Sequence, residues 1–528
     1  MSLFTGNRDR TVPRALLVYE IFSNIISYIK TENPASFKPF LEEPEPTLFA
    51  LALTCHALTE QALDALWDTL PSIEPLMRCA GIIPSPKERP KDGKGCSIIP
   101  TEAQLAVISR YAHRVRSLRL DTYRVRFLRE EFADRDGHMQ AFLRILACSS
   151  KVPVPNLRSL FVDFLREPFH LIYPLLGPRL QHLSISIYHN EPDDHPLHTV
   201  LPSLPCPSLE SLKFEQYNYL DYQEVVPCAL PVSHDILQQM QKLRIVDVPS
   251  IAKDALTFLG GLSSVTNIRT HLPTSSDLED ILGSSRGLEP VLFENIDSVD
   301  WEIKEWRDVE AFAHLWPSKL TSISLRSEVK LDPSLLQVLF DSLHTREAFR
   351  NLQCICLSEP SGPTLSISKV ITIDTIRPLL YLSHLQVVDI DTMSSLSIGD
   401  SDLEEIAKGW PCLEVLLLNK DYGFTSSAAP KPRWISVPGV VRFVESLPCL
   451  KKLAIGITLR TVKDDYDMKN LDDLEPRDSD SRLEDLTMRY PREEDYIWEA
   501  CYPDLDLLFT KLFPKVDPEV DLFSDTYC

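Results

Sequence analysis

The chain has 528 residues, of which 44% are hydrophobic, and its 54 basic and 76 acidic side chains give a formal net charge of −22. A chain of this length is too long for one compact core, so it forms either several domains or one elongated array. The negative charge opposes nonspecific attraction to phosphate backbones, and we predict no nucleic-acid partner.

The first segment, residues 1–14, is predicted to be a flexible N-terminus. It reaches charged residues before any apolar run long enough for a secretion signal, and the chain contains no run of eighteen apolar residues. We therefore expect no membrane partner and a location in the cytoplasm, the nucleus or both.

Residues 15–75 predict a short all-helical module. Its first helix carries apolar residues four positions apart, at Leu17, Ile21, Ile25 and Ile29. This spacing indicates an amphipathic helix with a wide apolar side that another surface must cover. A second apolar helix is predicted from about Leu48 to Leu66, and Trp67 closes it.

A Pro- and Lys-rich linker is predicted for residues 76–100, and a repeated strand pattern follows over residues 101–490. The pattern is apolar-x-x-apolar-x-apolar, and weaker copies of it begin at Val265 and Leu288. Its clear copies begin at Val115, Leu157, Leu180, Leu209, Leu243, Leu320, Leu352, Leu385, Leu413, Leu450 and Leu483. Units of one strand and one helix must stack to bury their apolar faces, so the pattern predicts an α/β solenoid. Residues 491–528 are expected to form a C-terminal cap or tail.

The stretch from Ser401 to Leu418 contains one whole unit. Ser401 is predicted to cap a helix with Glu404 reaching back to it, and Gly409 is predicted to end that helix. The expected buried positions are Leu403, Ile406 and Ala407 on the helix, then Leu413, Leu416 and Leu418 on the strand. Unit lengths vary, so we expect outward loops, for example at Ala428–Pro432 and at the acidic stretch Lys463–Asp480.

This pattern resembles the leucine-rich repeat family, in particular its cysteine-containing form, in which a helix leads through Pro-Cys into Leu-x-x-Leu-x-Leu. Pro411-Cys412-Leu413 and Pro448-Cys449-Leu450 match that form best. The resemblance implies parallel strands on a concave face and helices on a convex face. The family's asparagine ladder is missing, since Asp421 and Pro360 stand at the expected positions after two of the strands.

The N-terminal module resembles the F-box, which docks on the adaptor of cullin-RING ubiquitin ligases. The resemblance is carried by Leu17-Val-Tyr-Glu-Ile21, then by Leu51 to His56, and finally by Leu66-Trp67. The family proline is replaced by Val18 or Tyr19, and the basic residue after Cys55 is His56. The resemblance implies adaptor-binding residues at Leu17, Ile21, Ile25, Leu51, Cys55 and Trp67. The alternative is that the helices only cap the array.

Catalytic and metal-binding patterns are weak throughout the chain. Among 16 glycines there is no phosphate-binding glycine motif, and the 12 cysteines include no C-x-x-C pair, so we expect reduced thiols. The polar segment Asp193-Asp194-His195 with His198 is interpreted as a solvated loop rather than a metal site. We therefore predict no enzyme, no cofactor and no metal.

If positions one, four and six of each unit face the core, positions three and five lie on the opposite face of the sheet. Between Leu352 and Leu450 these positions form an apolar run edged by charge, which is typical of a protein-binding surface. The predicted substrate-binding residues are Cys354, Cys356, Val387, Asp389, Val415, Leu417, Lys452 and Ala454. Alternatively, a segment such as Tyr502–Phe513 covers this run.

The two resemblances together imply a substrate-recognition subunit of a cullin-RING (SCF-type) ubiquitin ligase. Its partners would be the adaptor with the cullin complex and a protein target. The rival interpretation is a leucine-rich repeat scaffold or protein-interaction module outside the ubiquitin system.

Overall fold

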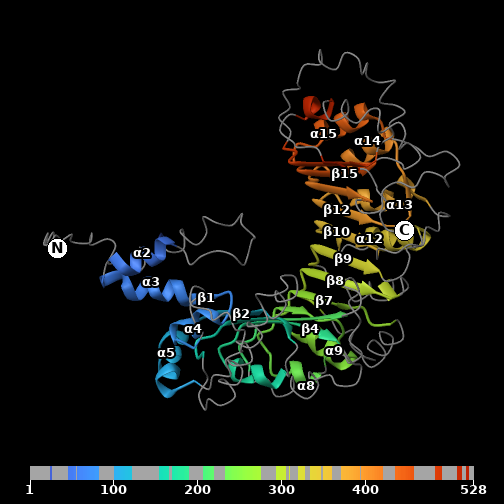
Figure 1. Cartoon of the computed structure of the whole chain (residues 1–528). Coiled ribbons are helices and arrows are strands. Elements are labelled where there is room, and N and C mark those ends of the chain that lie inside the picture. The colour runs from blue at the N-terminus through green and yellow to red at the C-terminus, as the bar shows by residue number, and fades with distance from the viewer. Residues whose placement is uncertain are drawn as a thin grey trace, which may run out of the picture. The chain divides into compact units, whose positions relative to one another are not determined.

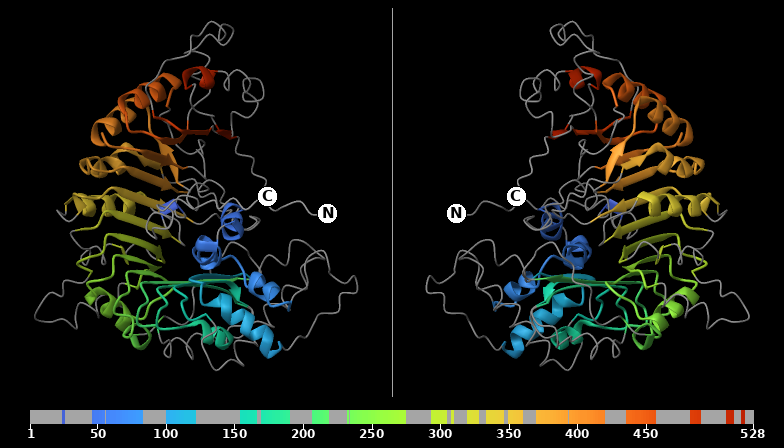
Figure 2. Two further views of the ribbon diagram at one scale, coloured as in Figure 1. Left: turned by 90° about the vertical axis from the view of Figure 1, so that its left-hand side faces the viewer. Right: turned by 90° about the vertical axis from the view of Figure 1, so that its right-hand side faces the viewer.

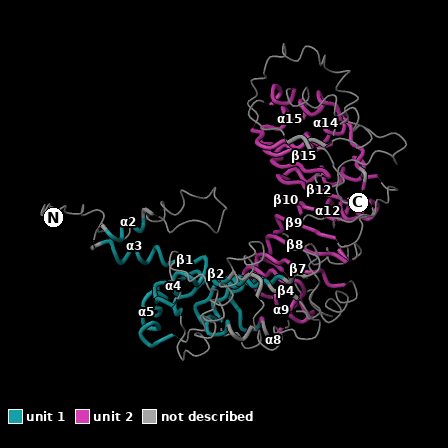
Figure 3. Tube along the Cα trace, viewed as in Figure 1, with its two compact units in different colours: residues 1–230, 238–243 teal, residues 231–237, 244–528 magenta. Residues whose placement is uncertain are grey.

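The computed structural model describes only part of the chain. The described residues are 24–25, 46–54, 56–82, 100–121, 154–165, 169–189, 206–218, 232, 234–274, 293–304, 308–309, 319–327, 333–345, 349–359, 370–392, 394–419, 435–456, 482–489, 508–513 and 519–521. The chain divides into two compact α/β units, residues 1–230 with 238–243 and residues 231–237 with 244–528 (Figure 3).

The first unit contains a parallel sheet whose strands follow chain order. They are β1 (Thr69–Leu70), β2 (Ser117–Asp121), β3 (Ser159–Leu165), β4 (His182–His189) and β5 (Ser211–Asn218). The helices are α2 (Pro46–Thr54), α3 (His56–Asp68), α4 (Glu74–Cys79), α5 (Glu102–Ala112) and the 3-10 helix η3 (Phe169–Leu175) (Figure 1). The short strand β1 joins the end of α3 directly to this sheet.

The second unit also contains a parallel sheet in chain order. Its strands are β6 (Ile245–Asp247), β7 (Asn267–His271), β8 (Ser298–Ile303), β9 (Ser322–Ser327), β10 (Cys354–Ser358), β12 (Val387–Asp391), β14 (Val415–Leu418), β15 (Lys452–Gly456), β16 (Asp485–Arg489) and β17 (Glu519–Asp521). Two further strands, β11 (Val370–Thr372) and β13 (Ser395–Ser397), pair separately.

Helices stand between several of the strands of the second unit. They are α8 (His234–Leu237), α9 (Lys253–Gly261), α12 (Pro333–Thr345), α13 (Ile373–Ile376), the 3-10 helix η6 (Arg377–Tyr381), α14 (Asp400–Gly409) and α15 (Val437–Ser446). Parallel neighbours need a crossover connection, and crossovers of one hand put the connecting helices on one side. Figure 2 shows the helices of this unit along one face of its sheet. We call the opposite sheet face the open face.

The strand pattern predicted these sheets well. A parallel strand begins two residues after the first residue of each clear copy and also after Val265. In the unit predicted around Ser401–Leu418, Leu413, Leu416 and Leu418 are at most 2% exposed. Apolar residues at positions one, four and six are therefore withdrawn from water, and their burial drives the stacking of strands.

One weak copy of the pattern does not coincide with a described strand. Leu288 lies outside the described residues, and β8 instead follows a further copy that begins at Ile296. In that copy Ile296, Val299 and Trp301 are all buried. In the C-terminal segment, residues 508–513 form a largely buried helical turn, and β17 extends the sheet beyond β16.

The predicted cap of α14 is wrong. Gly399 occupies the N-cap position, and its N–H donates to Asp402 Oδ2 at 2.9 Å, so Ser401 lies inside the helix. The predicted apolar face is confirmed, since Leu403, Ile406 and Ala407 are buried. Gly409 ends the helix as predicted, and a Cβ there would lie 2.8 Å from a side chain of η6.

Asparagines connect neighbouring copies of the strand pattern, although not at the positions of the missing asparagine ladder. Asn156 donates to a carbonyl of the preceding turn and accepts from Arg179, and Asn295 repeats this arrangement with Lys319. Asn419, which is 1% exposed at a φ of 52°, hydrogen-bonds backbone groups of the loop after β12. These side chains satisfy turn backbone groups that no strand partner reaches.

The helical module differs from its prediction in two ways. The helix expected from Leu48 to Leu66 is divided into α2 and α3, and Thr59 Oγ1 in α3 donates to the Ala52 carbonyl in α2 at 3.0 Å. Residues 76–79 of the predicted linker belong to α4, where Leu76 and Met77 are buried. The hydroxyl-to-carbonyl bond joins α2 and α3.

Other predictions fall on residues without description. The loops at Ala428–Pro432 and Lys463–Asp480 and the polar segment 193–198 lie outside the described residues. Across the described ranges, no helix is both long and apolar enough to cross a membrane.

Candidate functional site

The structure describes three of the six predicted adaptor-binding residues. Ile25 is half-buried in a helical turn, Leu51 is half-buried on α2, and Trp67 is half-buried near the end of α3. Trp67 stacks on Tyr111 of α5 with ring centroids 4.8 Å apart, so this side chain packs inside the first unit. The remaining three, Leu17, Ile21 and Cys55, lie outside the described residues.

Two apolar residues of α2 that the prediction omitted are exposed. Phe49 is 54% exposed and Leu53 is 72% exposed, whereas Leu48 on the same helix is 2% exposed. Phe49 and Leu53 are four residues apart and therefore lie on one side of the helix. Residues 46–54 are apolar around the whole helix, which is typical of a helix that is covered on all sides. The apolar composition of residues 46–54 was therefore a sequence signal that this helix has a covering partner.

The helical pair is fastened to the first sheet by an ion pair. The Arg114 guanidinium binds the carboxylates of Glu60 and Asp64 on α3. Burial opposes the charge of Arg114, but the hydrogen bonds from Arg114 to Glu60 and Asp64 raise the Arg114 pKa overall. The same hydrogen bond lowers the pKa of Glu60. Arg114 lies two residues after the end of α5, so these ion pairs fix α3 against the region between α5 and β2.

The open face of the second unit presents two rows of side chains in register. The first row is Ile245, Asn267, Ser298, Ser322, Cys354, Val387, Val415, Lys452 and Asp485. The second row is Asp247, Arg269, Asp300, Ser324, Cys356, Asp389, Leu417, Ala454 and Thr487. All eight predicted substrate-binding residues therefore lie in these rows, on four adjacent strands.

The exposure of these residues varies along the rows. Val387, Val415 and Leu417 are half-buried. Lys452 is exposed, and its Nζ lies 3.4 Å from Asp485 Oδ2. Ala454 is 2% exposed, so its prediction as a surface contact is wrong, because this short side chain is covered by its neighbours. The apolar part of the face is therefore formed by β10, β12 and β14.

Towards β6 the second row becomes charged. Arg269 Nε lies 3.6 Å from Asp247 and 3.4 Å from Asp300. Asp300 also accepts from Ser324 Oγ at 3.0 Å and from Arg326 Nη2 at 3.0 Å. These groups neutralise one another across neighbouring strands, so this end of the face is polar but internally paired.

The two cysteines of β10 form a close thiol pair. Cys354 Sγ lies 3.7 Å from Cys356 Sγ, and both side chains are half-buried. The hydrogen bond from Cys356, assisted by Ser322, lowers the Cys354 pKa to about 7, whereas the hydrogen bond to Cys354 raises the Cys356 pKa. Cys354 is therefore the more nucleophilic thiol at neutral pH. The described residues contain no group of three or more His, Cys, Asp or Glu side chains placed to hold a metal ion.

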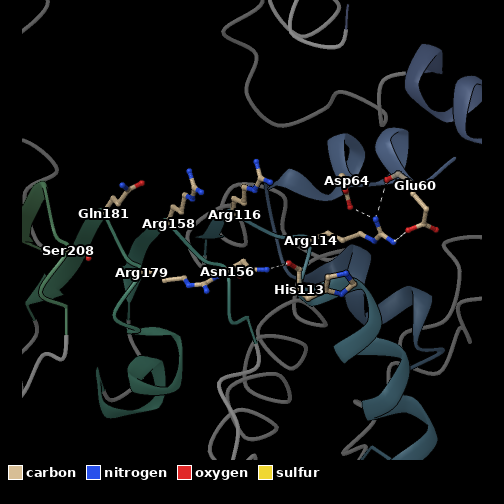
Figure 4. A pocket seen from close by; sticks show the side chains of 10 residues that line it. All are labelled: Glu60, Asp64, His113, Arg114, Arg116, Asn156, Arg158, Arg179, Gln181 and Ser208. Carbon is tan, nitrogen blue, oxygen red and sulfur yellow. Dashed lines mark hydrogen bonds and ion pairs between the residues drawn. The ribbon is translucent and has the colours of Figure 1, made fainter. Parts of the chain in front are cut away.

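A polar pocket in the first unit was not predicted. It has a volume of about 610 Å³ and lies at the edge of the sheet where β2, β3 and β4 begin (Figure 4). Its lining residues are Glu60, Asp64, His113, Arg114, Arg116, Asn156, Arg158, Arg179, Gln181 and Ser208. The sequence does carry a signal for this pocket. Arginine recurs one residue before or after the first position of successive copies of the strand pattern.

Similarity to known proteins does not identify the chain. No protein-family model matches it, and a search of curated proteins finds no match either.

Proposed function

We propose that the chain is a substrate-recognition subunit of a cullin-RING (SCF-type) ubiquitin ligase. In this proposal an F-box-like pair of N-terminal helices docks on the adaptor. An irregular leucine-rich repeat solenoid then holds the protein target, and other subunits carry out ubiquitin transfer. The chain itself would need no cofactor.

The observation that carries the adaptor half of this proposal is the exposed apolar side of α2. Phe49 and Leu53 present two large apolar side chains to solvent on a helix in which Leu48 is buried. Exposed apolar anchors of this kind dominate the affinity of helical interfaces. Their position, just before Cys55 in the segment that resembles an F-box, favours the adaptor as the occupant.

The target half of the proposal rests on the open face of the second unit. Val387, Val415 and Leu417 form an apolar centre there, and Asp389 and Lys452 add charge at its sides. An apolar centre with a charged rim is the usual composition of a protein interface.

A scaffold outside the ubiquitin system is the second candidate. The contacts of Trp67 with Tyr111 and of Arg114 with Glu60 and Asp64 tie α3 to the first sheet. A pair of helices held in this way would also serve as a terminal cap, which repeat arrays require.

Co-expression of the full chain with the ligase adaptor distinguishes the two candidates. We expect a stoichiometric complex that also assembles with the cullin. The chain remaining monomeric at micromolar adaptor would remove the ubiquitin-ligase proposal and leave the scaffold.

Target binding is tested separately on the open face. In affinity purification from cells, Leu417→Asp is expected to lose the proteins that the wild-type chain retains, while still binding the adaptor. Asn267→Asp is the matched control, since it places the same charge in the first row on β7. Equal retention by wild type and Leu417→Asp would contradict the role of this face.

A further inference from the structure

The pocket at the strand edge of the first unit concentrates positive charge in an acidic protein. Four arginines line it, against the two carboxylates of Glu60 and Asp64, while the whole chain carries a net charge of −22. Both carboxylates bind Arg114. The charge of the other three lining arginines, Arg116, Arg158 and Arg179, is therefore not balanced by the acids that line the pocket.

Two of these arginines are held side by side by the backbone. The Arg116 carbonyl accepts from the N–H groups of Arg158 and Ser159 at 2.7 and 2.9 Å, which fixes β2 against β3. The Arg158 carbonyl accepts from the N–H groups of Gln181 and His182 in the same manner, at 2.7 and 2.8 Å. Neighbouring strands lie about 4.8 Å apart, so the fold imposes a short spacing between two cationic side chains.

The third arginine approaches from a second row of positions. Arg179 donates to Asn156 Oδ1, and Asn156 Nδ2 donates to the His113 carbonyl at 2.6 Å. This bond to Asn156 uses one of five guanidinium N–H groups and holds Arg179 in place. In Figure 4 the side chains of Arg116, Arg158 and Gln181 point to the same side, and Arg179 lies with Asn156 in the row beside them.

The available counter-charges are few. Arg116 Nε lies 3.6 Å from Asp68 Oδ1, and 54% of the Arg116 side chain remains exposed. Within the described ranges, the guanidinium of Arg158 has neither a hydrogen bond nor an ion pair. Adjacent like charges repel one another, and a bound anion relieves that repulsion while it gains several charge-assisted hydrogen bonds.

We infer that this pocket binds a phosphate monoester. A tetrahedral dianion offers three terminal oxygens and accepts from several guanidinium forks at once, whereas one arginine already satisfies a planar carboxylate. Ser208 supplies a neutral donor at the pocket wall, and Gln181 Nε2, which donates to Glu210 Oε1 at 3.2 Å, carries a second N–H. The volume of about 610 Å³ is in the range of small-molecule sites and leaves room for the group that carries the phosphate. This inference is independent of the proposed ligase function.

Calorimetric titration of the full chain at constant ionic strength tests the site, with O-phosphoserine and glucose 6-phosphate as small probes. A phosphoserine peptide and its unphosphorylated form complete the set. Binding of the small probes assigns the site to free phosphorylated molecules, and binding of the phosphopeptide alone assigns it to a modified protein. Absence of binding by every phosphorylated probe, or equal binding of acetate, would overturn the inference.

The arginine variants give the second test. Arg158→Gln is expected to weaken, at least tenfold, the binding of whichever phosphorylated probe the wild-type chain binds. The double variant Arg116→Gln/Arg158→Gln is expected to abolish that binding. Both side chains are exposed, so circular dichroism should show an unchanged fold. Arg78→Gln is the matched control, because Arg78 is a surface arginine of the same unit paired with Glu74 and outside the pocket. An affinity of Arg158→Gln equal to that of the control would refute the assignment.

Discussion

The exposed side of α2 makes a quantitative prediction. Replacing Phe49 and Leu53 together by serine removes mostly apolar surface that is already in water, and loss of the smaller buried shares should lower the free energy of unfolding by about 1–2 kcal/mol. Leu48→Ala on the same helix removes a side chain that is 2% exposed and should cost about 2–5 kcal/mol.

The serine pair should weaken adaptor binding more than it lowers stability. Full burial of a Leu or Phe side chain stabilises by about 1.5–3 kcal/mol, and docking would bury the exposed shares, 54% of Phe49 and 72% of Leu53. The double serine variant should therefore lose about 2–4 kcal/mol of adaptor binding, which corresponds to a roughly 30- to 1,000-fold higher Kd.

Chemical denaturation of the chain and calorimetric titration with the adaptor measure the two quantities on the same samples. The reasoning requires that the serine pair loses more adaptor-binding free energy than unfolding free energy, and that Leu48→Ala loses more unfolding free energy than the serine pair. It would be refuted if the serine pair bound the adaptor as wild type does, or if it unfolded as easily as Leu48→Ala.

Two further predictions concern the second unit. A Cβ at Gly439 would lie 2.1 Å from Asp400 Oδ1, a carboxylate that accepts from the backbone and hydroxyl at the start of α15. Gly439→Ala should therefore lower the free energy of unfolding by about 2 kcal/mol, and Gly261→Ala, whose Cβ position is open, should lower it much less in the same denaturation assay. Because the Cys354 pKa is lowered to about 7, its alkylation rate in the folded chain should be half-maximal near pH 7, and loss of the thiol donor in Cys356→Ala should move the midpoint upwards. Mass spectrometry of alkylated peptides measures both midpoints, and a wild-type midpoint above pH 8.5 would contradict this assignment.

The strands could be predicted residue by residue because their signal is local. Leu416 and Leu418 are two positions apart and therefore share the buried side of β14, while Leu413 is buried just before the strand begins. Register between strands followed from the same pattern, since equal positions of successive units pair with one another. The rows on the open face were predictable for that reason.

Features that depend on neighbours were not predictable. The exposure of Phe49 and the burial of Ala454 are both at odds with expectations from residue type and position. The exposure of each side chain depends on which other parts of the chain pack against it. The spacing of residues in the sequence does not encode those contacts.

The sequence by itself therefore determined where the strands begin and the side of the sheet on which their residues lie. Tertiary structure alone decided which polar residues meet. Arg116, Arg158 and Arg179 lie at the starts of three successive strands of the first unit, and only stacking at a strand spacing of about 4.8 Å collects them in one pocket. Local periodicity specifies elements, whereas the pocket arises from contacts between strands whose residues are distant in sequence.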